Sequence, residues 1–276
     1  MHKNGRKIWW CEKNVVLLLA KGEMNMLKVN DDSPIQTKAE DLYIQWDELH
    51  VQLKGLCIYE SNNLKYSRLS KLPFKAINLL QSMTWRMSDI EESAKFLIEQ
   101  NYILPAVILI RSAMENTAFL HVLFKEIKDN ISNGELLESI DDMLMQMSYG
   151  NCYRKGEFIT DEVFESLSYY KSLRSGDILK AIDERYPGYY SMYRALCEFV
   201  HNNGDGVEGS YMYIDEENHK TYFRRILTKE SKLLEPFVGS LILALSIFLE
   251  LYGNLENLFP NFIKLCDEDI RKKSNR

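Results

Sequence analysis

The chain has few residues that break helices, and its few cysteines lie far apart in the sequence. Only six prolines and thirteen glycines are spread over 276 residues. Leu, Lys, Glu, Ile and Met are abundant, which favours long helices. The five cysteines lie far apart and include no C-x-x-C pair, so neither a zinc site nor a secreted disulfide framework is indicated. We therefore expect an all-α protein with reduced thiols, located in the cytoplasm.

The sequence also lacks the motifs of the common nucleotide-dependent enzymes and a long apolar segment. It contains no P-loop, no G-x-G-x-x-G and no G-x-S-x-G. The longest apolar run, residues 237–249, is shorter than a helix that spans a bilayer and is typical of a buried helix. We expect no cofactor and no membrane partner.

Charge is distributed unevenly along the chain. The net charge is −6, but the first thirty residues hold six basic and two acidic residues, which leaves −10 for the rest. Such an acidic body repels a phosphate backbone on average, so we expect no DNA partner, and RNA would need a local basic patch. We interpret residues 1–35 as a poorly specified basic leader, 36–268 as one helical domain and 269–276 as a basic tail. A membrane-peripheral protein that uses the leader is a third, less favoured interpretation.

Apolar periodicity predicts the main helices. Apolar residues recur at helical spacing over 42–56, and a second helix is expected to begin near Pro73. A separate helix over 93–101 is expected to end near Asn101. Pro105 is expected to open "AVILIRSAMENTAFLHVLFKEI", the most apolar long helix of the first half, which should lie in the middle of a bundle. The last long helix is predicted to begin near Thr228.

Capping and turn signals predict the remaining boundaries. Two S-x-x-E pairs, Ser88 with Glu91 and Ser132 with Glu135, are interpreted as capping boxes that begin further helices. Thr160 is expected to cap another helix, and a short one should follow Gly176. Tyrosines that alternate on both sides of "DEENHK" predict a small β-hairpin near residues 210–225.

The stretch "SMYRALCEFVHNNGDG" holds the main candidate for chemistry. Arg194 and His201 are seven residues apart, which at about 100° per residue places them on one face of a helix. His201 lies in the last turn, where unpaired carbonyls favour an imidazolium. A cation beside a proton donor or acceptor is what RNA cleavage without a metal requires: the imidazole acts as base or acid and Arg194 binds the phosphate. The alternative is a simple helix end, with Asn203 or Gly204 in the left-handed conformation and Arg194 solvated.

The same segment resembles a known family. "YRALCEFVH" is similar to the R-x(4 to 6)-H helix of the HEPN superfamily (higher eukaryotes and prokaryotes nucleotide-binding domain). "YRALCEFVHNN" more closely resembles the Y-x-x-L-S-x-x-V-H-P helix of a bacterial group of unknown function that is related to HEPN and to abortive-infection proteins. An earlier helix of that group carries R-S-x-x-E, and "RSAMENTAF" supplies Arg111, Ser112 and Glu115 here. The similarity covers roughly residues 70 to 255.

The resemblance implies a helical bundle, commonly a homodimer, in which the Arg/His helices of two subunits form a composite RNase site. It implies Arg194 and His201 as catalytic residues, in a protein of a stress or phage-defence system. Two positions depart from the family pattern: Ala195 replaces the polar residue that usually follows the arginine, and Cys197 stands where the closer group has serine. The alternative function is a non-catalytic helical module that binds a nucleotide or a partner.

Two further groups of residues are candidates for supporting roles. We interpret Arg111, Glu115, Tyr193 and Asn202 as a supporting polar site. Arg111 and Glu115 are four residues apart and form at least a helix pair, but if they lie next to Arg194 and His201 they indicate an organised site. The second group follows the predicted hairpin, where tyrosines are available for stacking, and is either an RNA-binding patch or a solvated helix start. It consists of Arg224, Arg225 and Lys229, with Lys232 nearby.

No metal site is predicted. Glu216 and His219 make an E-x-x-H, but they fall in the expected hairpin turn, and no second E-x-x-H exists. His50 and His121 are interpreted as core or boundary histidines. Cys197 is interpreted as a small hydrophobic residue, with a nucleophile near His201 as the less favoured alternative.

Overall fold

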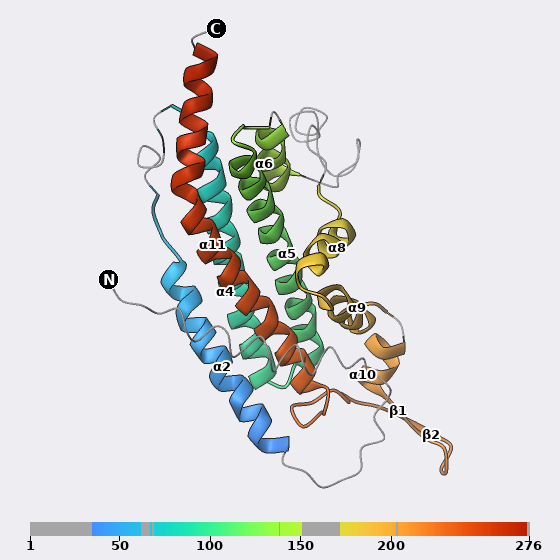
Figure 1. Cartoon of the computed structure of the whole chain (residues 1–276). Coiled ribbons are helices and arrows are strands. Elements are labelled where there is room, and N and C mark those ends of the chain that lie inside the picture. The colour runs from blue at the N-terminus through green and yellow to red at the C-terminus, as the bar shows by residue number, and fades with distance from the viewer. Residues whose placement is uncertain are drawn as a thin grey trace.

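The computed structural model describes residues 35–61, 67, 69–137, 139–150, 172–202 and 204–274, and in this part of the chain the protein is a helical bundle with one β-hairpin (Figure 1). The all-α class and the hairpin are therefore confirmed. The expected leader before residue 35 and the expected helix after Thr160 lie outside the described residues. The elements, in chain order, are α2 (Ile35–Leu56), α4 (Leu72–Glu99), α5 (Ile103–Asn133), α6 (Ser139–Tyr149), α8 (Ser175–Arg185), α9 (Tyr189–Val200), η1 (Gly204–Glu208), α10 (Gly209–Tyr211), β1 (Met212–Asp215), β2 (Lys220–Phe223) and α11 (Leu234–Ser274).

Helix α5 lies at the centre of the bundle, as its apolar sequence predicts. It packs against α4 and α11 on one side and against α8 and α9 on the other, while α2 covers α4 and α11 (Figure 1). Its inward residues, such as Ile110, Met114 and Leu120, are fully buried. Burial of each such side chain stabilises the fold by roughly 1.5–3 kcal/mol, so the bundle depends mainly on the apolar faces of α4, α5 and α11.

Polar side chains in the middle of α5 fix its neighbours. Asn116 donates to the carbonyl of Met83 on α4 over 2.9 Å, and the Thr117 hydroxyl lies 3.1 Å from the carbonyl of Ala244 on α11. Both side chains are almost completely buried, so each bond also satisfies a polar group that water cannot reach. These bonds set the positions of α4 and α11 along the axis of α5.

Both predicted capping boxes are wrong. Ser88 and Glu91 are buried inside α4, which continues without a break from Leu72 to Glu99. Ser132 lies in the last turn of α5 and bonds to the carbonyl of Lys128. The S-x-x-E spacing is one turn of any helix, so it marks a helix start only where the apolar periodicity also begins there.

Other predicted boundaries agree with the structure more closely. Helix α4 ends just before Asn101, which has a φ of 62°, and α8 begins at Ser175, next to Gly176. The predicted break "ERYPGYY" separates α8 from α9. The last helix begins at Leu234, six residues later than Thr228, and it extends to Ser274, into the segment 269–276 that was expected to be a tail.

The hairpin projects from the end of the bundle near α10 (Figure 1). Strands β1 and β2 are antiparallel, with Tyr213 opposite Tyr222 and Asp215 opposite Lys220. Residues 216–219 form the turn, in which His219 has a φ of 52°.

Two helices of the described chain, α5 and α11, are long and apolar enough to cross a membrane by length and composition. In each of them 56% of the apolar window is buried inside the bundle, and core helices of soluble proteins satisfy the same criterion.

Candidate functional site

Helix α9 carries the candidate site and is held on α5 by its buried face. Gly188, with a φ of 95°, starts the helix in a left-handed conformation that suits glycine. Tyr189, Tyr193 and Leu196 then face the bundle and are buried. The Tyr189 hydroxyl donates to the carbonyl of Met114 on α5 over 2.9 Å. The position of α9 is thus set by both apolar and polar contacts.

Four side chains form a polar network, the α5–α9 cluster, between these two helices: Arg111, Glu115, Tyr193 and Cys197. The Tyr193 hydroxyl donates to Glu115 Oε1 over 2.6 Å, and the Arg111 guanidinium forms a 3.1 Å ion pair with the same carboxylate. Arg111 also donates to the Tyr193 hydroxyl, and its Nε lies 3.2 Å from Cys197 Sγ. Every member therefore has at least one partner on the other helix.

Burial and charge act together in the α5–α9 cluster. Burial raises the pKa of Tyr193 well above its ordinary value, and the neighbouring Glu115 carboxylate raises it further, so the phenol stays protonated and donates to Glu115. Burial alone would lower the pKa of Arg111, but its bond to Cys197 and the Glu115 carboxylate raise it. The cluster is thus a protonated tyrosine and a permanent cation around one carboxylate.

The α5–α9 cluster contains three of the four residues of the predicted polar site. Arg111, Glu115 and Tyr193 are brought together as the sequence indicates. Cys197, interpreted as a small hydrophobic residue, is half-buried and bonded to Arg111. Asn202 is exposed, and within the described residues it makes no bond to the cluster. It is therefore not part of this network.

Arg194 on α9 and His201, directly after the last residue of α9, are both exposed and lie outside the α5–α9 cluster. No hydrogen bond or ion pair joins them within the described part of the chain. About 10 Å separates their Cα positions along the axis, because seven residues advance a helix by that length. The pair is thus accessible to a ligand, next to a helix that the cluster holds in place.

The end of α9 is closed by an unusually tight backbone contact. The His201 amide donates to the Cys197 carbonyl over 3.0 Å, and His201 itself is extended, with a ψ of 151°. Gly206 of η1 lies against this end, where a Cβ atom at position 206 would stand 2.0 Å from the His201 oxygen and 2.9 Å from the Phe199 oxygen. Gly204 begins η1, and Asn203 lies outside the described residues, so a simple helix end with a left-handed residue at 203 or 204 stays a prediction.

The predicted basic patch is held by contacts within the chain. The Arg224 guanidinium lies 5.6 Å from the centre of the Tyr213 ring and that of Arg225 lies 4.1 Å from the centre of the Tyr102 ring. Lys229 donates from its backbone amide to the Asn101 side chain and from Nζ to the carbonyl of Glu99, at the end of α4. Both arginines and Lys229 remain exposed.

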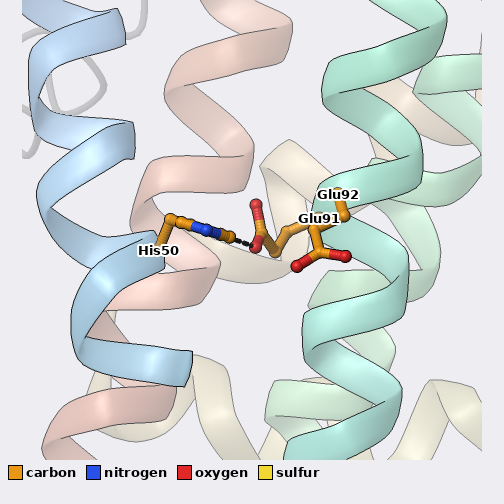
Figure 2. A group of neighbouring side chains, drawn as sticks. All are labelled: His50, Glu91 and Glu92. Carbon is orange, nitrogen blue, oxygen red and sulfur yellow. Dashed lines mark hydrogen bonds and ion pairs between the residues drawn. The ribbon is translucent and has the colours of Figure 1, made fainter. Parts of the chain in front are cut away.

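A second polar group, absent from the sequence predictions, lies between α2 and α4. The Glu91 side chain is fully buried, and its Oε2 accepts from the Trp46 ring N–H over 2.9 Å. Its Oε1 lies 2.5 Å from His50 Nδ1 (Figure 2). Glu92, the next residue of α4, forms an ion pair with Lys54 of α2. A signal for it was available, because Glu91 interrupts the apolar stripe of α4 at a core position beside Met87 and Ala94.

This second group has the residue types that hold a divalent cation. One ligand atom from each of His50, Glu91 and Glu92 lies within 4.8 Å of the other two, and the group lines an open depression of about 170 Å³. Trp46 and His50 already satisfy Glu91, and Lys54 neutralises Glu92, so the group is complete as a structural clamp between α2 and α4. Glu216 and His219 lie in the hairpin turn and, among the described residues, belong to no such group.

Comparison with protein-family models, with curated proteins and with solved structures finds no significant match to this chain.

Proposed function

We propose that the protein is a HEPN-like endoribonuclease of a stress or phage-defence system, which cleaves RNA without a metal and uses Arg194 and His201. The observation that carries the proposal is their placement: the Arg194 cation on α9 and the His201 imidazole directly after its last residue are both exposed, about two turns apart, and the α5–α9 cluster fixes this helix to the bundle core. Fixed position matters because catalysis of this kind depends on precise orientation of the reacting groups.

The chemistry assigned to the pair is a phosphoryl transfer within the RNA chain, from the 5′-oxygen of one nucleotide to the 2′-oxygen of its neighbour. The His201 imidazole removes the proton of a ribose 2′-hydroxyl, and the oxygen attacks the adjacent phosphorus. The Arg194 guanidinium stabilises the additional negative charge on the phosphate oxygens. The bond to the 5′-oxygen then breaks, this oxygen takes up a proton, and a 2′,3′-cyclic phosphate remains on the other fragment.

A homodimer belongs to the same proposal, together with a cytoplasmic location. The family resemblance implies that two copies bring their Arg/His helices together, and the exposed face of α9 leaves room for such an approach. In the dimer, the arginine of one copy and the histidine of the other would act on one phosphate.

The experiment is incubation of the purified full-length chain with mixed RNA in EDTA, followed by analysis of product ends. Cleavage with cyclic-phosphate ends is expected for the wild type and should be lost in both Arg194→Ala and His201→Ala. Two matched controls should cleave normally: Arg271→Ala, at the far end of α11, and His219→Ala, in the hairpin turn. A folded, dimeric wild type that cuts none of a varied set of RNAs would overturn the proposal.

A second function has one specific observation in its favour. Arg111 is bonded to Glu115, Tyr193 and Cys197, which is also what a purely structural cluster in a non-catalytic binding module would show. If such a module binds nucleotides at Arg194, nucleotide binding without cleavage should be lost in Arg194→Ala and kept in His201→Ala.

A further inference from the structure

We infer that the hairpin and the start of α5 carry a binding strip for single-stranded RNA, in which bases stack on tyrosines and phosphates meet arginines. This inference rests on the proposed function, because it names single-stranded RNA as the substrate class. The tyrosine strip is defined as Tyr102, Tyr211, Tyr213, Tyr222, Arg224 and Arg225.

The register of the hairpin gathers three members of the strip on one face. Tyr213 stands opposite Tyr222, and the Arg224 amide donates to the Tyr211 carbonyl over 2.9 Å, which continues the pairing by one position. Residues opposite each other in antiparallel strands point to the same face, and so do residues two apart. Tyr213, Tyr222 and Arg224 therefore share a face, and Tyr211, the last residue of α10, is hydrogen-bonded to Arg224 beside them.

The two tyrosines at the centre of the strip present accessible rings. The ring centres of Tyr213 and Tyr222 lie 6.3 Å apart with an interplanar angle of 29°, and the residues are 48% and 46% exposed. The Arg224 guanidinium adds a cation 5.6 Å from the Tyr213 ring centre. Base stacking on such rings tolerates any base, and an adjacent arginine serves the backbone phosphate.

The strip continues at the base of the hairpin. Tyr102, Tyr211 and Arg225 line a small hollow next to the first turn of α5. The guanidinium of Arg225 lies on the Tyr102 ring, and Lys229 anchors the following loop to the end of α4, so the cation is held in place. The first turn of α5 contributes the partial positive charge of a helix N-terminus.

Charge indicates which part of the hairpin meets the RNA backbone. The tip carries Asp215, Glu216 and Glu217, which repel phosphates, whereas Arg224 and Arg225 lie at the base. The phosphates are therefore expected at the base, with bases extending onto Tyr213 and Tyr222. The opposite face of the hairpin presents Ile214 and Phe223 and provides a matched control surface.

The test measures binding without cleavage. A fluorescent single-stranded oligonucleotide with 2′-O-methyl riboses has no attacking hydroxyl, so its binding to the full-length chain can be followed by anisotropy in EDTA. Tyr222→Ala should weaken binding roughly ten-fold through the loss of one stacked base, and Tyr222→Phe should restore it. Arg224→Ala should weaken binding and reduce the slope of log Kd against log salt by about 0.7. Phe223→Ala, on the other face, should leave the Kd unchanged.

Several outcomes would overturn the strip. One is the absence of saturable binding by the wild type. Another is a loss of affinity in Phe223→Ala equal to that in Tyr222→Ala. A third is tighter binding of a duplex, whose bases are not free to stack on the tyrosines. Self-association that Phe223→Ala abolishes, without RNA binding, would assign the hairpin to a protein contact. The proposed function is tested separately: wild type that binds but never cuts supports the strip and not the nuclease, whereas cleavage unchanged by Tyr222→Ala supports the nuclease and not the strip.

Discussion

Tyr193 on α9 donates its hydroxyl hydrogen to Glu115 on α5 over 2.6 Å, while Arg111, one turn before Glu115, bonds to the same hydroxyl and the same carboxylate. One phenolic oxygen therefore joins the candidate helix to a charged pair of the central helix. It is one of the contacts that hold α9, and with it Arg194, on the core.

Tyr193→Phe should separate this bond from the packing of the ring. The variant keeps the aromatic ring beneath the Arg111 guanidinium but leaves Glu115 and Arg111 short of a partner. We expect the free energy of unfolding to fall by about 1–2 kcal/mol, measured by urea denaturation. Tyr190 lies about one helical turn before Tyr193, and its hydroxyl has no partner among the described residues. Tyr190→Phe should therefore change the free energy of unfolding by less than about 0.5 kcal/mol. Equal losses in the two variants would contradict the role of the bond.

Glu91→Ala should be among the most destabilising substitutions in the described chain. It leaves the buried Trp46 N–H without an acceptor and removes the carboxylate that His50 contacts, so we expect a loss of about 3 kcal/mol or more. The neighbouring Glu92→Ala removes a partly exposed ion pair with Lys54 and should cost less than about 1 kcal/mol. Urea unfolding of both variants can be monitored by Trp fluorescence. A larger loss of stability in Glu92→Ala than in Glu91→Ala would contradict the clamp.

His121 should make the protein less stable in acid. It is 5% exposed, its Nδ1 has no partner among the described residues, and burial, then the charges of Arg185 and Lys125, lower its pKa from 6.5 to about 4. As the pH falls from about 6.5 to about 4, this histidine is protonated in the unfolded chain but stays neutral in the folded chain. The free energy of unfolding therefore declines over that range by about 2–3 kcal/mol.

The histidine contribution can be isolated by substitution. In His121→Phe the decline assigned to this residue should disappear from thermal melts recorded between these pH values, whereas the exposed His219→Ala should retain it. A pH profile that is identical in wild type and His121→Phe would show that the decline has another origin.

Gly206→Ala should disturb the end of α9. The added methyl would overlap the backbone oxygens of His201 and Phe199, which belong to rigid backbone and not to a flexible side chain. We expect a loss of about 1–3 kcal/mol and reduced hydrogen-exchange protection around His201. Gly209→Ala, where the nearest atom outside the adjoining residues lies at 3.5 Å, is the matched control and should be close to neutral.

Apolar periodicity was sufficient to predict the bundle, because α5 and α11 bury long apolar faces whose spacing is visible without any neighbour. The error at Ser88 and Glu91 has a physical cause: the capping pattern is local, whereas the burial of Glu91 depends on Trp46 and His50, forty or more residues earlier. A charged residue inside an apolar stripe was the available signal.

The candidate site was predictable only in part. The spacing of Arg111 and Glu115 placed them on one face, but nothing in the sequence specifies that Tyr193 and Cys197 would complete the network, since they lie 78 to 86 residues away. Whether Arg194 joins that network or faces solvent depends on the rotation of α9, which buried residues such as Leu196 decide.

The central place of α5 has a consequence for how the chain folds during synthesis. The corner between α4 and α5 closes through neighbours, such as the Tyr102 amide on the Leu97 carbonyl, and can form early. Helix α11, which packs on α5 beside α4, starts about a hundred residues after α5 ends. At ordinary rates of translation, the apolar surface of α5 that α11 covers therefore stays exposed for on the order of ten seconds. Nascent α5 is therefore the segment that most needs protection from aggregation on the ribosome.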